Sequence, residues 1–63
     1  MKRVDLIRHL EANGCTLLRE GARHSVYYNP AVQRTSTIPR DREVKNLTAI
    51  RICKQLNVPD PLR

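Results

Sequence analysis

Two histidines, His9 and His24, are the candidate groups for proton transfer in this chain. His9 lies off the apolar stripe of a predicted N-terminal helix, which is typical of a solvated or edge histidine. His24 follows a turn opened by Gly21 and begins a predicted strand, so its ring is expected near solvent at a fixed backbone position. Imidazole titrates near neutrality and can take a proton from a ribose 2′-hydroxyl or give one to a leaving oxygen. Because the sequence offers neither paired carboxylates nor a Ser-His-Asp arrangement, His24 is the candidate catalytic residue, and the residues alone leave open that it is a lone surface histidine of a basic protein.

Four arginines are expected near this histidine. Guanidinium groups bind phosphate bidentately and stabilise the charge that builds on it during cleavage. Two of the four come shortly before His24 in the sequence, and the other two come from the predicted neighbouring strand and its exit. The predicted RNA phosphate-binding residues are Arg19, Arg23, Arg34 and Arg40. A histidine beside several guanidinium groups is the arrangement that RNA cleavage without a metal or other cofactor requires. The two cysteines and two histidines lack the tight spacing of a structural zinc site.

Length and charge limit the kind of protein. With 63 residues, the chain is expected to form one domain, residues 1–63, with a modest aliphatic core. Its net charge of +6 suits nucleic acid, an anionic membrane surface or an acidic protein as partner. The sequence has no apolar run near the roughly 20 residues that span a bilayer, and charged residues follow Met1 directly. We therefore expect a cytoplasmic protein without a signal peptide, in which Cys15 and Cys53 are buried, reduced thiols.

Periodicity predicts the elements that position these groups. The expected order is a helix over 2–13, strands over 15–20, 25–28 and 35–38, a helix over 46–56 with Asn46 as N-cap, and a loose tail over 58–63. The predicted apolar stripes are Val4, Leu6, Ile7 and Leu10 in the first helix, and Leu47, Ile50, Ile52, Cys53 and Leu56 in the second.

Short connections between the strands predict antiparallel pairing. The expected fold is α+β, in the order α-β-β-β-α, with a three-stranded antiparallel sheet, both helices on one face and the other face open. Alternation does not decide whether Leu17 or Leu18 points inward. Tyr27 and Tyr28 must point to opposite faces, so one is expected in the core. The other is a sheet-face residue or stacks on an RNA base.

The middle of the chain resembles the HicA toxin family. The run from Glu20 to Pro30 looks like that family's Gly-x-x-His strand entry, and the pattern continues through 36–40. The resemblance extends from Lys2 to Pro59 and implies a fold similar to a double-stranded-RNA-binding domain. It further implies a toxin of a type II toxin–antitoxin system that cleaves mRNA, with His24 as the catalytic histidine. The implied partner is a HicB-type antitoxin that covers this histidine.

Two positions depart from the family pattern. Many relatives have a Gly-Ser pair directly before the histidine, where this chain has Ala22 and Arg23. Many also have a second histidine after the Pro-Arg pair, where this chain has Asp41. The additional arginine can contact phosphate or crowd the site. The missing histidine is interpreted as an auxiliary group that affects rate and substrate preference.

Two other classes of protein remain open from the sequence. One is a non-catalytic RNA-binding module of the double-stranded-RNA-binding-domain type, which needs basic residues at helix ends and loops and does not need His24. The other is an interaction protein whose basic face docks an acidic partner. A helix-turn-helix DNA reader is disfavoured, because the β-rich middle leaves too few helices.

Overall fold

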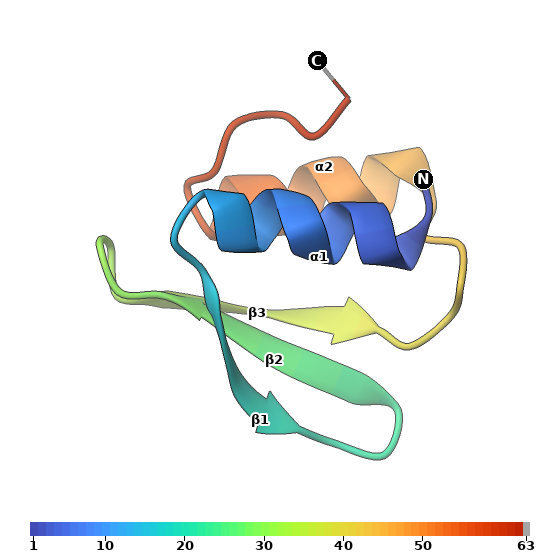
Figure 1. The fold of residues 1–63 in the computed structure, drawn as a ribbon, viewed down its shortest axis with the longest axis horizontal. Helices are drawn as coiled ribbons and strands as arrows, with labels where there is room; N and C mark the ends of the chain where they lie inside the picture. Colours follow the sequence, from blue (N-terminus) through green and yellow to red (C-terminus); the bar gives the residue numbers. More distant parts are fainter. Residues whose placement is uncertain (63) are drawn as a thin grey trace.

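The computed structural model describes residues 1–62 of the chain. Its elements are α1 (Arg3–Ala12), β1 (Thr16–Glu20), β2 (His24–Asn29), β3 (Arg34–Pro39) and α2 (Asn46–Gln55). The strands form one antiparallel sheet in the order β1-β2-β3, and both helices cover the same face of it (Figure 1). The predicted α+β fold is thus confirmed. Neither helix within residues 1–62 has the length and hydropathy that crossing a bilayer requires.

The core lies between the two helices and the covered face of the sheet. Its buried apolar side chains are Leu6, Leu10, Cys15, Tyr27, Ile38, Val44, Ala49, Ile52, Cys53, Leu56 and Val58. Burial alternates along β2, where Ser25, Tyr27 and Asn29 point inward. Tyr27 is therefore the core tyrosine, and Tyr28 lies on the open face with His24. Cys15 and Cys53 are buried free thiols, as predicted.

The predicted stripe of α2 is wrong in its first half. Leu47 is 60% exposed, whereas Leu56 is fully buried. The two residues are about two and a half turns apart and so lie on opposite sides of the helix. Steps of three alone rotate the stripe around the helix, while alternating steps of three and four keep it on one face. Ala49, Ile52 and Cys53 follow that second pattern, and they are the buried residues of α2.

Two smaller expectations also differ. Val4 of α1 is 60% exposed, because the core contacts come from Leu6 and Leu10. Both Leu17 and Leu18 are exposed, since β1 is an edge strand with an irregularity in its register between Leu17 and Arg19. Neither Leu17 nor Leu18 therefore points into the core, which strand alternation alone did not decide.

The ends of α2 also depart from expectation. Lys45 is its N-cap, and the Oδ1 atom of Asn46 instead accepts a hydrogen bond from the N-terminal ammonium at 3.1 Å. The predicted loose tail begins with a fixed residue. Val58 is buried, and its amide donates to the carbonyl of Cys53 at 2.8 Å. The last residue of that predicted tail, Arg63, lies outside the described residues.

Candidate active site

The backbone of His24 is held from two sides. The amide of Gly21 donates to the His24 carbonyl at 2.8 Å and closes the β1–β2 turn. A Cβ atom at position 21 would lie 3.0 Å from that carbonyl oxygen, so any larger residue there would require the turn to shift by a few tenths of an ångström. On the other side, His24 pairs with Pro39 across β2 and β3. The histidine therefore has the fixed position at the strand entry that the sequence predicted.

The His24 side chain lies on the open face of the sheet. It alternates with the inward-pointing Ser25 and is exposed, and within residues 1–62 its ring makes no hydrogen bond. His9 differs, because its Nε2 atom lies 2.8 Å from the carbonyl oxygen of Pro59 and holds the tail against α1. His9 is thus the edge histidine that the sequence predicted, and His24 is the one available to a ligand.

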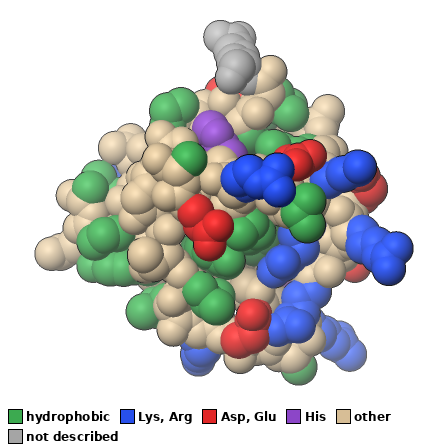
Figure 2. All heavy atoms as spheres, viewed as in Figure 1, with side chains coloured by type: hydrophobic (Ala, Val, Ile, Leu, Met, Phe, Trp, Pro, Cys, Tyr) green, Lys and Arg blue, Asp and Glu red, His purple; other side chains and the backbone are tan. Residues whose placement is uncertain are grey.

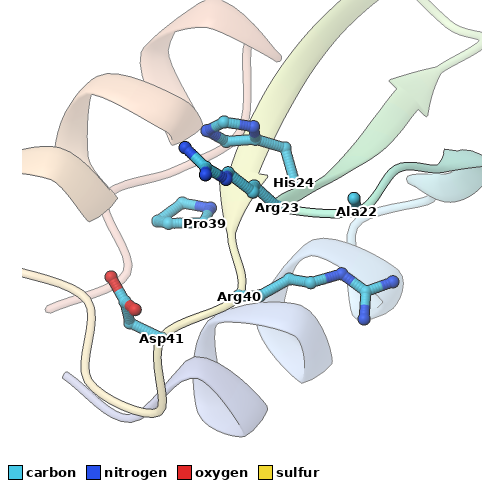
Figure 3. Close-up of a pocket in the computed structure, with 6 residues that line it drawn as sticks. All are labelled: Ala22, Arg23, His24, Pro39, Arg40 and Asp41. Atoms are coloured by element: carbon cyan, nitrogen blue, oxygen red, sulfur yellow. The ribbon is translucent and has the colours of Figure 1, made fainter.

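A hollow of about 470 Å³ adjoins the His24 ring. It is lined by Ala22, Arg23, His24, Pro39, Arg40 and Asp41. In Figure 3 the Arg23 guanidinium and the His24 ring extend to the same side, whereas the Arg40 side chain points away from them. The Pro39 ring lies between His24 and Asp41 in this view. The hollow therefore combines an exposed imidazole with a guanidinium group at one end of the sheet.

The four predicted phosphate-binding arginines do not all meet at this hollow. Arg23 and Arg40 line it. Arg19 pairs with Val26, two residues along β2 from His24, so it belongs to the same open face. Arg34 pairs with Asn29 at the opposite end of β2 and is not brought to His24. Sequence distance alone did not reveal this separation, because it depends on the register of β2 and β3.

A chain of polar contacts lies beneath the open face, directly behind His24. Arg3 donates from Nη2 to Ser25 Oγ at 2.7 Å and from Nε to the Pro39 carbonyl at 2.8 Å. Ser25 Oγ in turn donates to Glu20 Oε1, and Arg40 Nη2 lies 2.8 Å from the same carboxylate oxygen. This network joins α1 to all three strands at the end of the sheet that carries His24.

The network sets the charge state of its carboxylate. The hydrogen bond from Ser25 is the main cause that lowers the pKa of Glu20, and the positive charges of Arg40 and Arg3 act in the same direction. Glu20 therefore stays ionised and partly neutralises the positive charge of Arg40. Of the two arginines that line the hollow, Arg23 is thus the one with more positive charge available to a ligand.

The two thiols are not poised as nucleophiles. Burial is the main cause that raises the pKa of Cys53 to about 11, and burial also raises the pKa of Cys15. A thiol with a raised pKa is protonated at neutral pH and reacts slowly. Within residues 1–62, His, Cys, Asp and Glu form no cluster of three or more that could hold a metal ion.

Arg3, Ser25 and Glu20 contribute to the site and were not among the residues predicted for it. One signal was available, because Arg3 lies three residues before Leu6 and seven before Leu10, on the buried stripe of α1. A charged residue on an apolar stripe needs a partner in the core, and its partners here are Ser25 and the Pro39 carbonyl. The identity of those partners depends on tertiary packing.

Comparison with known proteins gives one match. The family model described as the HicA toxin of bacterial toxin–antitoxin systems matches residues 4–58, which include all five elements except the first residue of α1. Searches of curated proteins and of solved structures found no match.

Proposed function

The chain belongs to the HicA toxin family of bacterial toxin–antitoxin systems, and from this premise we propose that it is an endoribonuclease that cleaves mRNA. His24 serves as the general acid and base. The observation that carries the proposal is the exposed ring of His24 beside Arg23, at a hollow on the open face of the sheet. An open hollow suits a polymeric substrate, which cannot enter an enclosed cavity.

The chemistry assigned to these groups is transfer of a proton to or from the reacting oxygens. The neutral imidazole of His24 accepts the proton of a ribose 2′-hydroxyl, and the imidazolium gives a proton to the oxygen that leaves phosphorus. Arg23 holds the phosphate and stabilises its developing negative charge. Arg19 extends the cationic surface along the same face, and its charge attracts the RNA backbone. None of these roles requires a metal ion, so cleavage is expected to continue in the presence of a chelator.

Arg34 and Arg40 are expected to contribute less to phosphate binding than Arg23, for different reasons. Arg34 lies at the far end of β2 and contributes to RNA attraction only through the overall positive charge. Arg40 lines the hollow, but its guanidinium group is bound to Glu20. We expect Arg40 to contribute less to phosphate binding than Arg23.

The partner implied by the family is an antitoxin. We propose that it is a HicB-type protein that covers the His24 hollow and so prevents RNA from reaching the ring. The net charge of +6 favours an antitoxin that presents acidic residues to this face.

Incubation of the purified chain with RNA in EDTA tests the proposal. Fragmented RNA is the expected result. Intact RNA with shifted gel mobility would overturn the proposed endoribonuclease activity and favour a non-catalytic RNA-binding module. The open basic face also suits such a module.

A further inference from the structure

A second hollow lies beside the first and shares Arg40 with it. This basic groove has a volume of about 640 Å³ and is lined by Lys2, Arg3, Val4, Arg40, Arg42 and Glu43. Figure 2 shows Lys and Arg side chains gathered on the side of the molecule where α1 begins. Because both hollows include Arg40, a ligand bound beside His24 can continue into the basic groove.

The backbone of the basic groove is fixed by pairing of two distant segments. The Arg3 amide donates to the Arg42 carbonyl at 2.8 Å, and the Val44 amide donates to the Met1 carbonyl at 2.8 Å. Lys2 and Glu43 are paired as an antiparallel bridge. The side chains of the groove therefore project from a preformed backbone, which reduces the entropy lost on binding.

The charges of the basic groove are mostly uncompensated. Its one acidic residue, Glu43, already pairs with the N-terminal ammonium at 3.2 Å. Lys2 and Arg42 are exposed and form no ion pair with any residue in the described part of the chain. Two free cations beside Arg40 make a site for an anion, and the only exposed apolar residue lining the groove is Val4.

We propose that the basic groove binds a second phosphate of the RNA backbone, adjacent to the phosphate that His24 and Arg23 engage. This inference rests on the proposed function for the identity of the ligand. Arg42 follows Pro39 by three residues, so its Cα atom lies within about 11 Å of the residue that pairs with His24. The groove is thus near enough to hold the same strand on one side of the cleaved bond.

The experiment compares two variants of the full chain, each with a pair of substitutions added to His24→Ala, which keeps the RNA intact. Lys2→Gln with Arg42→Gln removes the two free cations of the groove. Arg51→Gln with Lys54→Gln is the matched control, because it removes the same charge from the exposed surface of α2. The affinity for a single-stranded RNA oligonucleotide is measured across a range of salt concentrations.

The groove variant is expected to reduce the magnitude of the slope of log K against log salt by about 0.7, since the groove is proposed to hold one phosphate and each phosphate contact on single strands contributes about 0.7. The control is expected to leave the slope unchanged. An unchanged slope in the groove variant would overturn the second phosphate site even if the native chain cuts RNA. Normal RNA binding together with loss of antitoxin binding would also overturn it, and would assign the groove to the protein partner.

Failure of the enzyme proposal is distinguishable from failure of the groove. If the native chain binds RNA without cutting it, and the groove variant still reduces the magnitude of the salt slope by about 0.7, the groove is supported and the enzyme is not.

Discussion

Arg3 in the first turn of α1 donates a hydrogen bond to Ser25, the residue that follows His24 in β2. Ser25 is fully buried, and the same arginine also binds the carbonyl of Pro39, the cross-strand partner of His24. One guanidinium group therefore holds β2 and β3 together at the end of the sheet where His24 begins β2. This partly buried contact links α1 to the strands that position His24.

Substitution Ser25→Ala is expected to lower both stability and cleavage. It leaves Arg3 and Glu20 without a shared partner, and the free energy of unfolding should fall by about 1–3 kcal/mol. Ser36→Ala is the matched control, because Ser36 is buried on the same face and donates to Gln55 at 2.6 Å away from His24. Urea unfolding should show a loss in both variants. Only Ser25→Ala should reduce kcat under conditions where each is folded, and equal kcat values would contradict a positioning role.

Acid should weaken the protein partly through Glu20. The folded state lowers the pKa of this carboxyl, so its contribution to stability is full above the ordinary value of 4.5 and is lost as pH falls through the lower, folded value. Glu20→Gln is expected to show a smaller loss of stability on acidification than the native chain. Glu11→Gln, which removes an exposed carboxylate at the other end of α1, should follow the native profile. The measurement is the urea midpoint of unfolding at each pH between 3 and 6. If the midpoints of the native chain and of Glu20→Gln fall in parallel, Glu20 does not contribute to stability through this network.

Asp41 places a negative charge at the rim of the His24 hollow. Substitution Asp41→Asn is expected to tighten RNA binding by up to about 1 kcal/mol, the size of an interaction between exposed charges. Fluorescence titration with His24→Ala as background gives the comparison. Glu11→Gln removes the same charge elsewhere, and a gain of equal size in that variant would attribute the effect to net charge alone.

The sequence predicted the position of His24 because its causes are local. Gly21, the turn and the alternation of β2 all lie within a few residues of it. The place of Arg34 was not predictable in the same way, because it depends on which residue of β2 it faces. The predicted stripe of α2 is wrong in its first half, because a run of three-residue steps turns away from the core face at Leu47. The contact between Arg3 and Ser25 joins residues 22 positions apart and needed the packed structure.

The most direct test of the account is RNA cleavage in EDTA by the purified native chain, by His24→Ala and by His9→Gln. General acid–base catalysis contributes about 10²–10⁴-fold, so His24→Ala should lose at least about 10²-fold in rate. Its stability should change by no more than about 0.5 kcal/mol, because the ring is exposed. His9→Gln should cut RNA at the native rate. A folded His24→Ala protein that cleaves RNA as fast as the native chain would contradict the account.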